Sequence, residues 1–264
     1  MKTSKPIKLI TFDFVGTLAT FKKRFITSHS YGRNNHGAPG LYSLYASKHG
    51  INVDPQILTK TFGIAFKEVD SRWPNFGSEQ KIPTKIWWSS VITECFKKAD
   101  VQSVNNQNFP SLIDELYDSF TEGSKTYECY PDTKLVLGHL HRRNIKLGCI
   151  SNNDERLHHV LESLSLKQYF DFVLTSKELG ILKPQKEIFE QAISLGGVEA
   201  GEALHIGDDV ERDFNGAKGA GMNALLLARD ETAEERIPHN FDRDFLIPDL
   251  MPLHASFWMT LKSE

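Results

Sequence analysis

The sequence predicts an α/β fold: a Rossmann-like parallel sheet with helices on both faces, interrupted by an inserted all-helical cap. Short apolar runs alternate with helical patterns along most of the chain, which is typical of βαβ units. The runs are mostly apolar, as expected for strands that are buried on both faces. Between about residues 41 and 127 the strand-like runs are missing and only helical patterns occur.

The first expected strand covers residues 7–12 and ends at Asp13, with the turn residues Gly16 and Thr17 close behind it. Four further runs have the same character, and they cover residues 145–150, 172–175, 203–206 and 224–228. Each is short and β-prone, so the core sheet is expected to contain at least these strands.

A helical pattern separates the third run from the fourth. Pro184 is expected at its first helical position, and the pair Gly196-Gly197 is expected to end it. Its apolar stripe consists of Ile188, Phe189, Ala192 and Ile193.

The insert is expected to hold three helices. The first begins at Pro55 behind the capping residue Asp54, the second contains Trp87, and the third follows Pro110. Their apolar faces are Ile57, Leu58, Phe62, Ala65, Phe66 and Val69; Ile86, Trp87, Val91 and Cys95; and Leu112, Ile113, Leu116, Tyr117 and Phe120. The tryptophans at 73, 87 and 88 are expected in the cap core or at its interface with the core domain.

Domain boundaries follow from these patterns. Residues 1–20 and 128–264 are expected to form the core domain, and residues 21–127 a flexible connection (21–40) followed by the cap. A cap of this kind sets substrate choice and excludes water during turnover. The tail after Asp230 is expected to pack as a terminal helix.

Composition excludes several classes of function. With 40% hydrophobic and 25% charged residues the chain is an ordinary globular protein, and its net charge of −3 gives no reason to expect nucleic acid or anionic membranes as partners. No apolar stretch approaches the roughly 20 residues that a bilayer requires. The three cysteines are widely spaced and form no CxxC pair, which indicates a reducing compartment. With no signal-peptide pattern at the N-terminus, a cytoplasmic location is expected, with the nucleus as a further possibility.

Polar residues stand where the expected strands end. In an open parallel sheet, the ligand crevice lies at the carboxyl ends of the strands. Asp13, Ser151 and the pair Asp208-Asp209 occupy these positions. Asp209 is expected to be structural, as a cap for the segment that follows it.

Four motifs together resemble those of the haloacid dehalogenase-like hydrolase superfamily. They are Asp13-Phe14-Val15-Gly16-Thr17-Leu18, Ser151-Asn152, Lys183-Pro184 before a helix, and Gly207-Asp208-Asp209-Val210-Glu211-Arg212-Asp213. Order and spacing match the superfamily from residue 9 to about 222. More narrowly, Trp73-Pro74-Asn75-Phe76-Gly77, Trp87-Trp88 and residues 170–176 are similar to the haloacid dehalogenase-like hydrolase domain-containing protein 3 group.

This resemblance implies a Mg²⁺-dependent phosphatase that acts on a small phosphorylated molecule. A carboxylate that attacks a phosphoryl group brings two anions together, so their charge must be neutralised, and Mg²⁺ prefers oxygen ligands. Asp13 would be the nucleophile and also a metal ligand. The other metal ligands would be Asp208, Asp213 and the backbone carbonyl of Val15, and the phosphoryl oxygens would be held by Thr17, Ser151, Asn152 and Lys183.

Val15 departs from the superfamily pattern, which has a second aspartate there to protonate the leaving group and activate water. The expected result is slow turnover, or a preference for acyl or aryl phosphates, unless Asp154 or Glu178 substitutes. Three alternatives stay open: a non-catalytic protein that binds a phosphorylated ligand or partner, dehalogenase-type hydrolysis, and phosphonate cleavage with a cap lysine. Dehalogenation is disfavoured because Gly207-Asp208 is kept.

Overall fold

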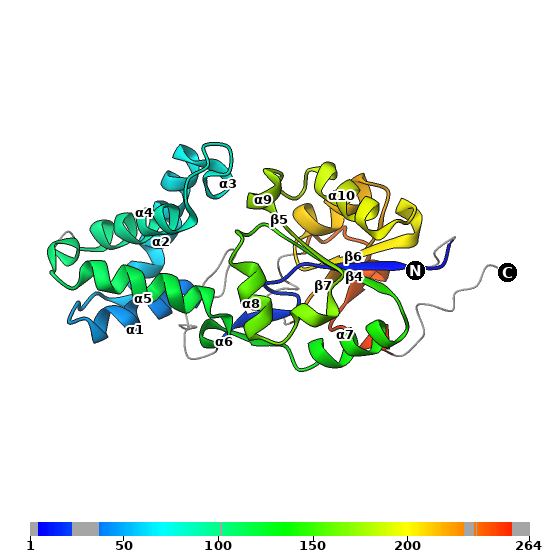
Figure 1. Ribbon diagram of the computed structural model, residues 1–264, viewed down its shortest axis with the longest axis horizontal. Coiled ribbons are helices and arrows are strands. Elements are labelled where there is room, and N and C mark those ends of the chain that lie inside the picture. The colour runs from blue at the N-terminus through cyan, green and yellow to red at the C-terminus, as the bar shows by residue number, and fades with distance from the viewer. Residues whose placement is uncertain (1–4, 23–36, 101, 230–234, 236, 255–264) are drawn as a thin grey trace. The chain divides into compact units, whose positions relative to one another are not determined.

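The structure is a computed structural model that describes residues 5–22, 37–100, 102–229, 235 and 237–254. These residues form two compact units (Figure 1). The first comprises residues 1–20, 129–158 and 164–264, and the second comprises residues 21–128 and 159–163. Residues 159–163 therefore cluster with the second unit, whereas the sequence assigned them to the core.

A six-stranded parallel sheet forms the centre of the first unit, in the order β5-β4-β1-β6-β7-β8. The strands are β1 (Leu9–Phe12), β4 (Lys146–Ser151), β5 (Phe172–Thr175), β6 (Ala203–Gly207), β7 (Asn223–Leu227) and β8 (Leu246–Ile247). This is a doubly wound sheet whose chain order reverses between β1 and β6, the point at which such folds bind their ligands. The expected fold class and the five expected strands are confirmed, and β8 is an additional strand.

The central strands have no polar face. Every residue of β1 and β6 is buried, as the continuous apolar runs predict. In the register, Thr11 of β1 lies between Gly148 of β4 and His205 of β6. Asp13 follows directly, and its backbone N–H donates to the carbonyl of Ile206 at 2.9 Å. The register therefore brings the residue after β1 to the end of β6.

Helices cover both sides of this sheet, with α7 and α10 among them (Figure 1). The helices of the first unit, with one that continues into the second, are α7 (Thr133–Arg142), α8 (Leu157–Ser163), α9 (Ser176–Leu179), α10 (Lys186–Gly196), α11 (Gly216–Gly219) and α13 (Met251–His254). Short turns complete it at η3 (Lys167–Tyr169), η4 (Ala200–Glu202), η5 (Val210–Asn215) and η6 (Arg243–Phe245).

The start of α10 differs from the prediction. Pro184 is not its first helical residue, since Lys183 and Pro184, joined by a cis peptide bond, lie in the turn before the helix. The helix begins at Lys186 and ends, as expected, before Gly197, whose φ of +61° closes it.

The predicted terminal helix is wrong for the residues that the structure describes. After residue 237 the chain makes η6, adds β8 to the edge of the sheet beside β7, and ends its described part in the four-residue α13. Phe241 contacts Phe214 edge-on, with ring centroids 4.9 Å apart. Phe257 lies outside the described residues.

The second unit is built on helices: α1 (Gly37–Lys48), α2 (Pro55–Arg72), α3 (Pro74–Gly77), α4 (Thr84–Ala99), η2 (Ser103–Asn105), α5 (Phe109–Thr121) and α6 (Gly123–Thr126). Asp54 caps α2 by accepting from the backbone N–H of Gln56 at 2.8 Å, as expected. Two expectations fail. The helix α1 begins inside the predicted connection, of which residues 23–36 lie outside the described part. A two-stranded sheet of β2 (Ala19–Phe21) and β3 (Tyr127–Cys129) stands where the chain passes between the units.

The apolar core of this unit contains most of the expected helix faces, with Trp87 fully buried in it. The indole N–H of Trp87 donates to the carbonyl of Trp73 at 2.9 Å. Ile57 and Ile86 were expected on the buried faces but are 41% and 52% exposed. Both stand in the first turn of their helices, α2 and α4.

Among the described residues, every helix is too short or too polar to cross a membrane.

Candidate active site

Three carboxylates meet at the carboxyl end of the sheet. Asp13 follows β1, Asp208 follows β6, and Asp213 lies in η5 one turn later. One carboxylate oxygen from each lies within 4.8 Å of the other two. All three were expected at a metal site, and the structure brings them together at the switch point of the sheet.

Asp213 reaches this position because the chain turns tightly after β6. Asp209 accepts from the backbone N–H groups of Glu211 and Arg212 at 3.0 and 2.8 Å, which makes it the cap of η5, as expected. Its own N–H donates to Asp213 at 3.1 Å. Position 207, at the end of β6, requires glycine, because a Cβ there would lie 2.2 Å from Cγ of Asp213. The six-residue η5 is a π-helical turn, a form that is frequent at functional sites.

Gly16 is required on the other side of the cluster. Its φ is +85°, in the left-handed region that favours glycine, and a Cβ would lie 2.4 Å from the nearer carboxylate oxygen of Asp208. The backbone at Gly16 therefore lies so close to the Asp208 carboxylate that there is no room for a side chain between them. Val15, which precedes Gly16, has a hydrocarbon side chain and adds no titratable group here.

Lys183 supplies the positive charge of the site. Its ammonium donates to Oδ1 of Asp13 at 2.7 Å, to Oδ1 of Asp213 at 2.6 Å, and to the carbonyl of Ile150 at 2.9 Å. The side chain is 2% exposed. Asn152 fixes the backbone of Lys183, accepting from its N–H at 2.8 Å and donating to its carbonyl at 3.0 Å.

Burial and charge act against each other on the pKa values of these groups. Burial raises the pKa of Asp13, and Lys183 only partly offsets it. Burial also opposes ionisation of Asp213, but Lys183 and His205 together lower its pKa well below the usual range. Burial disfavours the ammonium of Lys183, yet the two carboxylates outweigh this effect and raise its pKa. The result is a buried ammonium with a firmly ionised Asp213 and a carboxylate at Asp13 that is costly to keep charged.

His205 supports Asp213 from inside the sheet. Its Nε2 lies 3.1 Å from Oδ1 of Asp213, and its Nδ1 lies 2.8 Å from Oγ1 of Thr11. Burial lowers the pKa of His205, so the ring is neutral, and an ionised Asp213 can only accept. Nε2 therefore carries the proton, and the Thr11 hydroxyl donates to Nδ1. This pair was not expected from the sequence, since it depends on the register between β1 and β6.

The residues present fit a divalent cation. Asp13, Asp208 and Asp213 carry three formal negative charges and Lys183 one positive charge, so these four side chains retain a formal charge of −2. Oxygen ligands are the kind that Mg²⁺ prefers. The backbone carbonyl of Val15 as a further ligand stays a prediction.

A buried hydroxyl in the turn after β1, that of Thr17, makes no hydrogen bond. Thr17 is fully buried, and its Oγ1 has no hydrogen-bond partner. Such atoms are rare in folded proteins, because an unsatisfied polar group costs about 1–3 kcal/mol. A ligand oxygen at this place would satisfy it. Ser151, at the end of β4, is also buried.

Other expected roles look different in the structure. Both polar atoms of the Asn152 side chain bind the backbone of Lys183, so its observed role is to position this lysine. Asp154 is fully buried and forms a two-point ion pair with Arg156 at 2.8 Å. Glu178 accepts from Thr175 at 2.6 Å and lies 3.0 Å from Nε2 of His158. The carboxylates of Asp154 and Glu178 are thus both engaged outside the acidic cluster.

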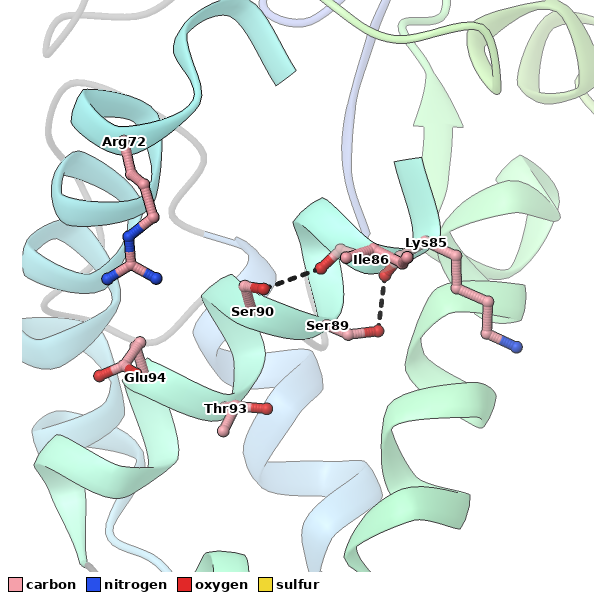
Figure 2. A pocket seen from close by; sticks show the side chains of 7 residues that line it. All are labelled: Arg72, Lys85, Ile86, Ser89, Ser90, Thr93 and Glu94. Carbon is pink, nitrogen blue, oxygen red and sulfur yellow. Dashed lines mark hydrogen bonds between the residues drawn. The ribbon is translucent and has the colours of Figure 1, made fainter. Parts of the chain in front are cut away.

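A hollow of about 450 Å³ lies elsewhere, in the second unit (Figure 2). It is lined by Arg72, Lys85, Ile86, Ser89, Ser90, Thr93 and Glu94, none of which is buried. The hydroxyls of Ser89 and Ser90 donate to the carbonyls of Lys85 and Ile86, one turn earlier in α4. The hollow therefore lacks the buried, converging polar groups that the acidic cluster has.

Comparison with known proteins shows the family of this chain. A family model described as haloacid dehalogenase-like hydrolase matches residues 7–221. Haloacid dehalogenase-like hydrolase domain-containing protein 3 of Bos taurus is 30% identical over 247 residues, which cover 94% of this chain and 92% of that protein. The resemblance to this group is confirmed.

Two solved structures illustrate the fold. A HAD phosphatase from Thermococcus onnurineus is 24% identical with a TM-score of 0.60, and a 2-haloacid dehalogenase from Pseudomonas syringae pv. Tomato DC3000 is 24% identical with a TM-score of 0.63. Each match covers 96% of this chain and 99% of the other. At this identity the likeness concerns the fold alone, and the two proteins are named for different reactions.

Proposed function

We propose that this chain, which belongs to the haloacid dehalogenase-like hydrolase family, is a Mg²⁺-dependent phosphatase that acts through Asp13 on a small phosphorylated substrate. The observation that carries the proposal is the buried cluster of Asp13, Asp208, Asp213 and Lys183 with its formal charge of −2. The unpartnered hydroxyl of Thr17 beside it supports a phosphoryl ligand.

Each residue of the site has its own role in the proposed reaction. Bound Mg²⁺ would neutralise charge between the nucleophile and the phosphoryl oxygens, held by Asp13, Asp208 and Asp213. A carboxylate oxygen of Asp13 attacks phosphorus, the bond to the leaving oxygen breaks, and an aspartyl phosphate forms. Thr17 and Ser151 donate their hydroxyls to phosphoryl oxygens. Lys183 favours the ionised form of Asp13 and orients it, and water then releases phosphate.

Val15 limits the substrates. Valine cannot protonate a leaving group or activate water, and the loss of such a general acid–base costs about 10²–10⁴-fold in rate. Asp154 and Glu178 are bound to Arg156 and to Thr175, which argues against either as a substitute. The proposed substrates are therefore acyl or aryl phosphates, whose leaving groups depart as stable anions.

The test is hydrolysis of an activated aryl phosphate with Mg²⁺ by wild type, Asp13→Asn and Val15→Asp. We expect slow turnover in wild type, none in Asp13→Asn, and a gain of up to about 10²–10⁴-fold in Val15→Asp. No turnover in wild type together with a clear gain in Val15→Asp would refute the active phosphatase. Excess chelator is the control for metal dependence.

Val15 also favours a second candidate, a protein that binds a phosphorylated ligand without converting it. Such a protein keeps its metal and phosphate ligands and can lose the acid–base. Calorimetry with Mg²⁺ and an aryl phosphate distinguishes the two, since binding without product supports the second candidate. We place catalysis first because binding does not require a nucleophile at Asp13.

We further propose a location in the cytoplasm, with the nucleus as a second compartment. The support is that Cys95, Cys129 and Cys149 are all free thiols, as expected in a reducing environment. Imaging of a fluorescent fusion tests this, and accumulation in a secretory compartment would contradict it.

A further inference from the structure

The turn that carries Thr17 is held by the buried ion pair of Arg229 and Asp132, two residues that lie far from it in the sequence. Arg229, two residues after β7, donates from Nη2 to the carbonyl of Thr17 at 2.6 Å. Its Nη1 lies 2.9 Å from both carboxylate oxygens of Asp132. The side chains of Arg229 and Asp132 are each 9% exposed. The charge of Arg229 is therefore balanced locally by Asp132.

Further contacts fix the geometry of this pair. The guanidinium lies over the ring of Tyr130, 3.9 Å from its centroid. Asp132 also accepts from the backbone N–H of Leu250 at 2.7 Å. A buried carboxylate with several donors has little freedom to move, because each lost hydrogen bond would leave a charged group unsatisfied. The guanidinium is thus a rigid anchor for the Thr17 carbonyl.

The neighbouring residue is anchored in the same way. The carbonyl of Leu18 accepts from the hydroxyl of Thr133 at 2.7 Å and from the backbone N–H of Tyr130 at 3.1 Å. The backbone of the turn is thus tied down at two successive carbonyls, whereas Oγ1 of Thr17 has no partner. The backbone around this unpartnered hydroxyl is therefore fixed on the protein side.

We propose that Arg229 and Asp132 are positioning residues that set the Thr17 hydroxyl for the phosphoryl group. This inference rests on the proposed function, because the phosphoryl group is its ligand. Displacements of about 1 Å at such a group can cost roughly 10²-fold in rate. Lysine at 229 would keep the charge but lacks the planar fork that reaches Asp132 and Thr17 together.

A double-mutant cycle tests whether Arg229 acts through Thr17. The affinity for inorganic phosphate with saturating Mg²⁺ is measured by calorimetry for wild type, Thr17→Val, Arg229→Lys and the double variant. We expect each single variant to bind about tenfold more weakly, the value of one hydrogen bond. The double variant should bind no more weakly than Thr17→Val, because the hydroxyl that Arg229 positions is already absent.

Controls separate positioning from general loss of stability. Ile188→Val, a buried change in α10, should lower the melting temperature and leave phosphate affinity unchanged. Asp132→Asn should reproduce Arg229→Lys, and each variant must retain the wild-type circular dichroism spectrum. Unchanged affinity in Arg229→Lys, or additive losses in the double variant, would overturn the inference while leaving the proposed function intact. Wild type that binds no phosphate with Mg²⁺ would overturn the proposed function, and this inference with it.

Discussion

The ammonium of Lys183 lies between two buried carboxylates, so we expect its substitution to affect stability as well as chemistry. Lys183→Met leaves the buried carboxylates of Asp13 and Asp213 without their shared ammonium. Breaking a buried ion pair from one side costs about 3–5 kcal/mol. Urea denaturation without metal should show a loss of this size. Lys186→Met is the control, since Lys186 is an exposed lysine paired with Glu190, and an equal loss there would contradict the explanation.

Asp13→Asn should have the opposite effect on stability. Burial raises the pKa of Asp13, so its charge opposes folding at neutral pH, and a neutral amide removes this cost. We expect turnover to vanish while the melting temperature without metal rises by roughly 2–4 °C, the shift for about 1 kcal/mol. The difference should shrink as the pH is lowered, because a raised pKa lets folded wild type take up the proton before the unfolded chain does. Scanning calorimetry at several pH values measures this, and a lower melting temperature at pH 7 would contradict it.

Gly16→Ala tests the close approach of the turn to Asp208. Alanine meets two obstacles: a φ of +85° and a Cβ 2.4 Å from the Asp208 carboxylate. We expect Mg²⁺ affinity, measured by calorimetry, to fall by tenfold or more, or about 1.4 kcal/mol. Gly50→Ala is the matched control, because Gly50 has a φ of +72° and open space around its Cβ. Mg²⁺ affinity that is lost equally in both variants would contradict a specific role of the Asp208 contact.

Single residues also show which parts of the candidate site could be predicted from the sequence. Asp13, Lys183, Asp208 and Asp213 were predictable because strand ends and motif spacing determine their place in this fold. The pair of Thr11 and His205 was not, since it depends on a register between strands far apart in the chain. Arg229 was missed for the same reason: nothing local links residue 229 to the carbonyl of residue 17.

At the level of elements, the sequence was most informative where burial is continuous. The five strands are rich in apolar residues, and their expected positions were correct to within two residues. Helix faces were less certain in first turns, where Ile57 and Ile86 follow the apolar pattern and yet are exposed. The two-residue β8 is too short to give a periodic signal, and it depends on pairing with β7.

The elements that hold the cysteines predict how the thiols react. Cys95 is buried in α4 and Cys149 in β4, where burial raises the pKa of the Cys95 thiol to about 11 and that of Cys149 further. At pH 8 about one Cys95 in a thousand is then thiolate. Cys129 in β3 is only partly buried. A chromogenic disulfide reagent should therefore modify one thiol in the native protein and three after unfolding. Cys129→Ser should abolish the reaction of the folded protein with the reagent. Fast modification of Cys95 in the folded protein would contradict its burial in α4.

At the scale of the whole molecule, the acidic cluster belongs to one unit only. Asp13, Asp208, Asp213 and Lys183 all lie in the unit that contains the six-stranded sheet, whereas Trp73, Trp87 and Trp88 lie in the other. A metal ion held by these side chains therefore stabilises the first unit directly. Mg²⁺ and tryptophan fluorescence together can show whether the second unit responds as well.

Mg²⁺ should raise the melting temperature by mass action, because the carboxylates converge only in the folded state. At 100 times the dissociation constant the gain is about 2.7 kcal/mol, or roughly 5–10 °C for a unit of this size. Asp208→Asn should abolish the shift, whereas Asp209→Asn should keep it, since asparagine also caps helices and Asp209 lies outside the cluster. An equal shift in Asp208→Asn would contradict the metal site. In a Trp258→Phe background, circular dichroism follows both units and tryptophan fluorescence follows the second. A shift in both signals would mean that the units unfold together, and a shift in circular dichroism alone would mean that Mg²⁺ stabilises only the unit that binds it.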